Sequence, residues 1–325
     1  MTQLVGRRPI VAPHELISAL VPPPHFADVR FDTYEPDLDF PSQQQALRAT
    51  QEFVAGLGGR TGLKRASSSS AGRGVYLDGG FGVGKTHLLA SMAHAVGAQA
   101  AFGTFVEYTH LVGALGFQTA RAALQEFRLL CIDEFELDDP GDTVMMARLM
   151  RELADAGVAL AATSNTLPES LGQGRFAADD FKREIQAVAS VFTVVTIDGP
   201  DYRHRGDLEF APASPAQVEA VASTDGGSVA EWNALVADLS HVHPSRMGAY
   251  VEGVRVLGLA NVEPLTDQAS ALRVVTLMDR LYDRDVQVVA SGASLGEIFP
   301  PDMLRGGFRK KYYRALSRLA AMAER

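Results

Sequence analysis

The sequence predicts an α/β fold: a mostly parallel sheet sandwiched by helices, plus a smaller C-terminal α/β domain. Two observations predict it. Short runs with strand composition alternate with helical patterns along most of the chain, which is typical of strand–helix–strand units with parallel strands. One run, Arg128 to Phe135, has a continuous apolar centre before it ends in two carboxylates, as expected for a strand that helices cover on both faces.

Length and composition limit the class of protein. At 325 residues the chain exceeds the ~150 residues of a typical domain, so we expect two domains. It contains no apolar run of the ~18 residues that a membrane-spanning helix needs, and its start lacks the apolar core of a signal peptide. We therefore expect a cytoplasmic protein with no transmembrane segment. The net charge of −9 makes nucleic acid an unlikely partner.

The first segment, residues 1–24, ends in three consecutive prolines and is expected to be an N-terminal arm. The main domain is expected at 25–198. It opens with aromatic residues, among them Tyr34, which is a candidate contact for a nucleotide base, although aromatic residues more often belong to a core. A helix with a Ser42 cap follows. Residues 56–74 are rich in Gly and Ser and are expected to form a flexible loop.

A strand, a glycine-rich turn and a helix start follow one another between Val75 and Leu89. Between Gly79 and Thr86 the chain matches G-x-x-x-x-G-K-[ST], the Walker A phosphate-binding loop. Glycines let backbone amides approach phosphate oxygens, Lys85 adds a positive charge, and the Thr86 hydroxyl can bind Mg²⁺. The alternative is a glycine-rich turn without a ligand. The residues expected to contact nucleotide are Gly79, Gly80, Phe81, Gly82, Val83, Gly84, Lys85, Thr86 and His87, with the upstream Tyr34.

The next elements alternate as the fold class requires. A strand is expected at 101–108, a helix at 109–127, and the apolar strand ends in Asp133 and Glu134, as in a Walker B motif. In open α/β sheets, ligands bind at the carboxyl ends of the strands. We expect Asp133 to hold Mg²⁺, mostly through water, and Glu134 to orient and deprotonate the attacking water. An apolar strand that happens to stop at acidic residues is the alternative, which the upstream phosphate loop disfavours. Cys131, inside this strand, is expected to be buried filler.

A helix at 142–157 precedes another buried strand at 158–165. Asn165, at its end, can reach a γ-phosphate or the attacking water. The alternative is a turn-forming asparagine before a proline. A last strand of the sheet is expected at 191–197.

The second domain is expected at 199–325, after a turn-rich boundary. Its expected elements are a helix around Trp232, a strand at 251–262, a helix at 267–282, a strand at 286–290 and a basic final helix. The basic residues of that helix form either a solvated face, arginines that face a neighbouring subunit's phosphates, or a surface for an acidic partner. They are Arg309, Lys310, Lys311, Arg314 and Arg318.

Several segments together resemble the ZapE family of AAA+ ATPases, cell-division ATPases related to the mitochondrial Afg-type and lactation-elevated proteins. The segments are GGFGVGKTHLL, LLCIDEF, ATSNTLPESL, DYRHR at 201–205, VVTLMDRLYD at 274–283, and RALSRLAAM. The resemblance covers residues 26–322. The phosphate loop and the acidic strand occur in all AAA+ proteins, so the later motifs give the resemblance its specificity.

The resemblance implies that Asn165 is a sensing residue and that one arginine acts on a neighbouring subunit's nucleotide. Arg175 and Arg273 lie near the family's arginine positions, and Arg183 is a third candidate. The sequence departs from the family in three places: Leu272 and Val274 replace an arginine and a phenylalanine beside Arg273, and the segment between Arg175 and Ile185 differs. The resemblance also implies a nucleotide-dependent homo-oligomer and protein partners, possibly the tubulin-like ring protein of the division septum.

These observations predict ATP hydrolysis with ATP and Mg²⁺ as cofactors. The expected catalytic residues are Glu134, Lys85, Asn165, Arg175 and Arg273, and the expected metal ligands are Thr86 and Asp133. Three alternatives are open: a helicase-loader ATPase, which shares the GKTH and TSN segments, a small-molecule kinase with a phosphate loop, and a nucleotide-gated scaffold without turnover.

Overall fold

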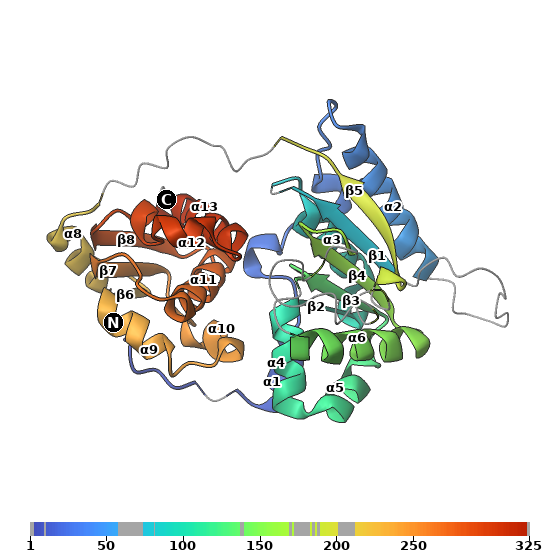
Figure 1. Cartoon of the computed structure of the whole chain (residues 1–325), viewed down its shortest axis with the longest axis horizontal. Coiled ribbons are helices and arrows are strands. Elements are labelled where there is room, and N and C mark those ends of the chain that lie inside the picture. The colour runs from blue at the N-terminus through green and yellow to red at the C-terminus, as the bar shows by residue number, and fades with distance from the viewer. Residues whose placement is uncertain are drawn as a thin grey trace. The chain divides into compact units, whose positions relative to one another are not determined.

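The computed structural model describes residues 3–9, 11–57, 74–80, 82–136, 140–168, 171, 183, 186, 189–200 and 212–323. The chain divides into two compact units (Figure 1). The N-terminal unit comprises Ala12–Pro22 and Phe26–Tyr202. The C-terminal unit comprises Met1–Val11, Pro23–His25 and Arg203–Arg325. The expected loop at 56–74 lies, for residues 58–73, outside the described part of the chain.

The N-terminal unit contains a five-stranded sheet in the order β2-β3-β4-β1-β5, and all of its described pairings are parallel. The strands are β1 (Gly74–Gly79), β2 (Ala100–Thr104), β3 (Leu129–Asp133), β4 (Ala159–Ser164) and β5 (Phe192–Ile197). Every residue of β3 and β4 is buried, which fits their apolar composition. Leu77 pairs with Thr163 and Ile132 pairs with Ala162, so β1, β3 and β4 end at the same edge.

Helices cover both faces of this sheet, as the α/β class requires. One core contains side chains of α2 and α3, and the other contains side chains of α4, α5 and α6. The helices are α1 (Pro13–Ser18), α2 (Pro41–Leu57), α3 (Lys85–Val96), α4 (Phe105–Leu115), α5 (Phe117–Leu124) and α6 (Pro140–Asp155). Cys131 is buried between them, as expected, and burial raises the pKa of its thiol.

The strand expected at 101–108 and the helix expected at 109–127 are wrong in their boundaries. β2 ends at Thr104, whose hydroxyl accepts a hydrogen bond from the Glu107 amide at 3.3 Å. Glu107 Oε2 in turn accepts from the Thr104 amide at 2.7 Å, so a capping box starts α4 inside the expected strand. Gly116, with φ +76°, then separates α4 from α5.

Residues 1–24, expected as an arm, are shared between the two units. Leu4 is fully buried in the core of the C-terminal unit. The Gly6 amide and the Arg8 guanidinium donate to the two carboxylate oxygens of Asp238, at 2.9 and 2.7 Å. Burial alone raises the pKa of Asp238, but these bonds and one from a tyrosine outweigh it and lower the pKa.

Another part of the N-terminal segment packs within the N-terminal unit. Leu20 is buried, and its carbonyl accepts a hydrogen bond from the Phe102 amide of β2 at 2.9 Å. A side chain at Gly103 would lie 2.8 Å from Leu20. Leu20 therefore covers part of β2, which is the edge strand on that side of the sheet.

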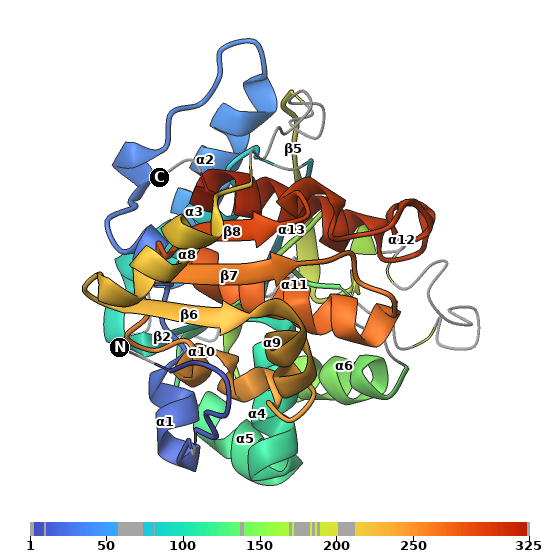
Figure 2. The ribbon, with the colours of Figure 1, turned by 90° about the vertical axis from the view of Figure 1, so that its left-hand side faces the viewer.

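The C-terminal unit contains a three-stranded parallel sheet, β6-β7-β8 (Figure 2). Its strands are β6 (Gly227–Glu231), β7 (Val256–Val262) and β8 (Gln287–Gly292). Its helices are α8 (Pro215–Ala220), α9 (Trp232–Leu239), α10 (Met247–Tyr250), α11 (Gln268–Asp283), α12 (Pro301–Arg305) and α13 (Arg309–Ala323). Sequence reasoning missed β6, because its residues, GSVAE, include few with strong strand propensity.

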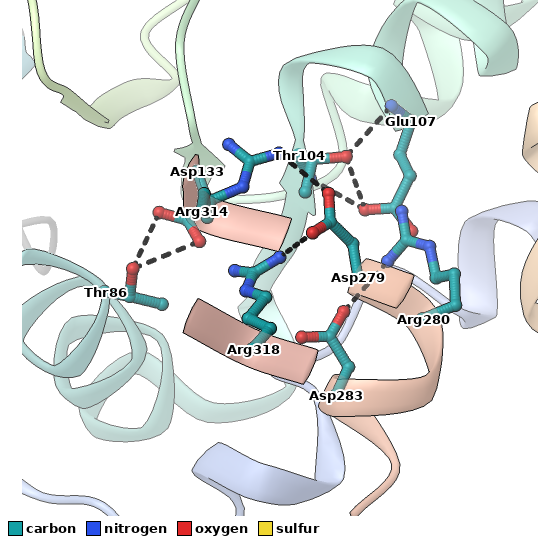
Figure 3. Close-up of polar contacts among 9 residues, drawn as sticks. All are labelled: Thr86, Thr104, Glu107, Asp133, Asp279, Arg280, Asp283, Arg314 and Arg318. Atoms are coloured by element: carbon teal, nitrogen blue, oxygen red, sulfur yellow. Dashed lines mark hydrogen bonds and ion pairs between the residues drawn. The ribbon is translucent and has the colours of Figure 1, made fainter. Parts of the chain in front are cut away.

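Two arginines of α13 do not lie on a solvated face. Arg314 Nη2 lies 2.7 Å from one carboxylate oxygen of Asp279, and Arg318 pairs with the other oxygen (Figure 3). The Asp279 side chain is only 16% exposed. Burial alone would raise its pKa, but the two guanidinium groups outweigh it and lower the pKa. For these two arginines the expected solvated face is wrong, whereas Arg309 is exposed.

Within the described part of the chain, no helix combines the length and the apolar character needed to cross a bilayer.

Replacing Asp279 with Asn should destabilise the C-terminal unit by about 3–5 kcal/mol, because two largely buried guanidinium groups would lose the ion pairs that they make with this carboxylate. Trp232 is the sole tryptophan and is buried in this unit, so its fluorescence during urea unfolding reports on this unit. Asp302→Asn is the matched control. It removes an ion pair whose carboxylate is 96% exposed, and it should cost about 0–1 kcal/mol.

The pH dependence of the same variant has a defined sign. The folded-state pKa of Asp279 is lowered, so its stabilisation is present above the ordinary aspartate pKa of about 3.9 and is lost as the pH falls through the folded-state value. The stability difference between wild type and Asp279→Asn should therefore shrink below about pH 4. A difference that grows on acidification would contradict the assignment.

Leu4→Ala should lower the unfolding free energy of the C-terminal unit by about 2–5 kcal/mol, because it leaves a cavity in that core. Asp302→Asn, at a side chain of the same unit that is 96% exposed, again provides the control and should cost about 0–1 kcal/mol. Both variants are measured through Trp232. If Leu4→Ala behaved like Asp302→Asn, the N-terminal residues would not fold with this unit.

Candidate functional site

The glycine-rich turn joins β1 to α3 and depends on its glycines in two ways. Gly82 and Gly84 have φ of +81° and +85°, in the left-handed region that glycine adopts without strain. A Cβ at Gly79 would lie 2.3 Å from the Ile197 carbonyl oxygen, so a side chain cannot fit there. Gly84 immediately precedes α3, and having no side chain it cannot cap the helix. The first amides of α3 therefore remain suited to an anion. Phe81 lies outside the described residues.

Lys85 and Asn165 come together although they lie 80 residues apart. Lys85 Nζ donates to Asn165 Oδ1 at 2.7 Å, and also to the carbonyl oxygens of Gly79, at 2.9 Å, and Gly80. The amide of Asn165 is thus oriented by its oxygen, which fixes the direction of its NH₂ donor. The parallel order of β1 and β4 produces this contact.

Thr86 and Asp133 form a second pair (Figure 3). Thr86 Oγ1, in the first turn of α3, donates to both carboxylate oxygens of Asp133, at 3.1 and 3.2 Å. Asp133 is the last residue of β3 and is buried. A hydroxyl beside a carboxylate fits Mg²⁺, which takes oxygen ligands and usually keeps several waters and phosphate oxygens in its shell.

Glu134 follows Asp133 in an unusual conformation. Its φ is +53°, which few residues other than glycine adopt and which other contacts must stabilise. Its amide donates to Thr163 Oγ1 at 3.0 Å. Thr163 Oγ1 itself donates to Asp133 Oδ1, so it contacts both acidic residues.

Sequence reasoning did not single out Thr163, because at the polar end of this strand, Thr-Ser-Asn, only Asn165 was given a role. The available signal was its position: Thr163 lies in the buried strand that follows the acidic strand, two residues before Asn165. A polar residue so placed, in a strand that is otherwise apolar, requires a partner.

Tyr34 packs against the phosphate loop. Its hydroxyl donates to the Val83 carbonyl at 2.9 Å, and a Cβ at Gly84 would lie 2.4 Å from its ring. Burial raises the pKa of Tyr34 to about 12. His87 Nε2 lies 3.1 Å from the Arg30 carbonyl, so this upstream segment is joined to α3 as well. A base contact by Tyr34 stays a prediction.

The three candidate arginines lie in different parts of the chain. Arg175 lies outside the described residues, and Arg183 is an exposed helical residue. Arg273 lies on α11 of the C-terminal unit. Val274, which departs from the family's phenylalanine, is fully buried in the core of that unit. The choice among the arginines stays a prediction.

The chain is similar to proteins of known family. The Escherichia coli (strain K12) cell division protein ZapE is 27% identical over 319 residues, which cover 84% of each chain. The Danio rerio lactation elevated protein 1 homolog B is 28% identical over 211 residues, covering 53% of this chain and 42% of that protein. Among solved structures, domain III of the Thermotoga maritima replication initiation protein DnaA has a TM-score of 0.42 at 19% identity, covering 55% of this chain and 69% of that one.

The family assignment rests on sequence. The DnaA likeness is too weak to carry an argument, and the fold follows from the strand order given above. The profile of the AFG1-like ATPases matches residues 10–236 and 215–325, which together span almost the whole chain. The chain therefore belongs to the AFG1-like ATPase family.

Proposed function

We propose that this protein hydrolyses ATP in a Mg²⁺-dependent reaction at the carboxyl edge of its five-stranded sheet. One observation carries the proposal: β1, β3 and β4 end at one edge, where Lys85 contacts Asn165 and Thr86 contacts Asp133. Each pair joins groups that are distant in sequence and that have complementary roles towards a nucleotide triphosphate and its metal.

The phosphates would bind at the turn between β1 and α3. Backbone amides and the positive end of the α3 dipole attract the anion. Lys85 is held by carbonyl oxygens of the same turn and would bind the β- and γ-phosphates. Thr86 and Asp133 would hold Mg²⁺, which when bound neutralises charge on the phosphate oxygens. Tyr34 would hold the turn in place through its hydrogen bond to the Val83 carbonyl.

Glu134 would accept a proton from the attacking water and orient it towards the γ-phosphate. Asn165, held by Lys85, would donate its amide hydrogens to that water or to a phosphate oxygen. The water attacks phosphorus, the bond to the leaving phosphate oxygen breaks, and the products are ADP and phosphate. Catalysis is then mostly positioning and electrostatic stabilisation.

We further propose that the ATPase works in the cytoplasm as a nucleotide-dependent homo-oligomer and acts on protein partners in cell division. The similarity to ZapE, named as a cell division protein, supports the partner class, and the tubulin-like ring protein is a candidate. Arg175, Arg183 and Arg273 are the candidates for an arginine acting on a neighbouring subunit. In related phosphoryl-transfer enzymes, such an arginine raises kcat by a factor of about 10³–10⁵.

Glu134→Gln should lower the rate of phosphate release from ATP by at least about 100-fold, because the amide cannot accept the proton. Binding of ATP should be retained, since Glu134 is not a phosphate contact. The measurements are Mg²⁺-dependent phosphate release and equilibrium binding of ATP. Wild-type protein that binds ATP and never turns it over would contradict the proposal and favour a nucleotide-gated scaffold.

Mixing variants tests whether the site is shared between subunits. Each of Arg175, Arg183 and Arg273 is replaced by Ala in turn, and each variant is mixed with Glu134→Gln. The Ala variant supplies an intact Glu134, and the Glu134→Gln chain supplies the arginine to its neighbour. For the arginine that acts between subunits, the mixture should therefore hydrolyse ATP faster than either variant alone. A mixture of Glu134→Gln with Lys85→Ala is the control. The Walker A lysine and Glu134 must act within one chain, so no activity should return. Turnover per chain that is unchanged on dilution, with no restoration by any of the three arginine variants, would refute the shared site.

A further inference from the structure

We propose that Thr163 is a positioning residue of the ATPase site, which fixes both the metal-binding carboxylate of Asp133 and the backbone turn that directs Glu134. The inference rests on the proposed function, because positioning is meaningful only if these two residues act on the metal and the water. Thr163 itself contacts neither nucleotide nor water in this proposal.

The Thr163 hydroxyl both donates and accepts a hydrogen bond. Thr163 Oγ1 donates its one hydrogen to Asp133 Oδ1 and accepts from the Glu134 amide at 3.0 Å. Its carbonyl oxygen accepts from the Phe135 amide at 2.7 Å. Three consecutive residues after the apolar part of β3 are thus tied to one residue of β4. Thr163 is 2% exposed, so water cannot readily replace these bonds.

The bond to Asp133 sets the orientation of its carboxylate. Asp133 Oδ1 accepts a hydrogen bond from Thr163, and Thr86 donates to both Oδ1 and Oδ2. If Thr86 and Asp133 hold Mg²⁺, the Thr86 hydroxyl would also serve the metal. The Thr163 bond does not involve that hydroxyl, and it would orient the carboxylate as outer hydrogen bonds commonly do for metal ligands.

The bond to the Glu134 amide stabilises a costly conformation. A residue other than glycine at φ +53° is strained by about 1 kcal/mol or more. The Thr163 hydroxyl and carbonyl bond to the amides of Glu134 and Phe135 and so determine where the chain turns out of β3. The direction of the Glu134 carboxylate depends on this turn. The orientation of a general base matters because a small displacement of the reacting groups lowers the rate by a large factor.

The neighbours of Thr163 cannot take over this role. Ser164 Oγ accepts from the Thr166 amide at 3.1 Å, and Asn165 contacts Lys85. At the carboxyl end of β4, Thr163 therefore contacts the acidic residues Asp133 and Glu134, whereas Asn165 contacts Lys85 of the phosphate loop.

The test compares Thr163→Val with Thr163→Ser. Valine keeps the branched shape but has no hydroxyl, whereas serine keeps the hydroxyl. Thr163→Val should lower kcat by about 10–100-fold with KM for ATP changed by less than about threefold, and it should raise the Mg²⁺ concentration needed for half-maximal rate. Thr163→Ser should stay within about threefold of wild type. Thr50→Val, at a fully buried threonine of α2, is the matched control and should leave kcat unchanged.

A binding measurement separates this inference from the hydrolase proposal. Mg²⁺ should tighten the binding of a fluorescent non-hydrolysable ATP analogue to wild type and to Thr163→Ser, and this gain should be reduced in Thr163→Val. If wild type binds the analogue with a Mg²⁺ gain but shows no turnover, hydrolysis is refuted and the Asp133 part of the inference is still tested.

The inference is overturned if Thr163→Val keeps wild-type kcat and the full Mg²⁺ gain, or if Thr163→Ser is impaired as much as Thr163→Val. The second result would show that side-chain volume, not the hydroxyl, matters. Circular dichroism and thermal unfolding check that each variant is folded. If Thr163→Val does not fold, Thr163→Ala provides the same comparison with serine, because it lacks the hydroxyl without adding bulk.

Discussion

Parallel pairing of β4 with β1 on one side and β3 on the other is the constraint on which the candidate site depends. Each strand arrives with its carboxyl end at the same edge, so residues tens of positions apart become neighbours. The register matters as much as the direction. Because side chains alternate between faces, a shift by one residue would turn Thr163 away from Asp133, and the acidic residues would lose their common hydrogen-bond partner.

Much of this arrangement could be predicted from sequence because it follows from patterns of adjacent residues. An apolar strand that ends in two carboxylates, and a glycine-rich turn before a helix, locate a site without any knowledge of packing. The contact of Thr86 with Asp133 and that of Lys85 with Asn165 follow from the strand ends alone. Thr163 was not found because its role depends on a hydrogen bond to the Glu134 backbone amide, which no residue pattern specifies. The left-handed conformation of Glu134 that produces this contact cannot be predicted from the residue type.

The C-terminal unit shows the same limit for charged residues. Arg314 and Arg318 lie on a helix whose charges suggest exposure, since charged side chains are rarely buried without a partner. Their partner, Asp279, lies on another helix, and nothing local in the sequence joins them. Strand β6 was missed for a related reason, because sheet pairing overrides its weak local preference. The start of α4 is different. Thr104 and Glu107 form a capping box, which is a local signal that the sequence already carried.

The place of Leu4 and Asp238 in one core has a consequence for biosynthesis. Leu4 and its neighbours are synthesised before the groups that they contact, which lie up to 245 positions later. This core can be completed only after those later residues are made. A loop that contains the N-terminal unit must then close, which slows folding.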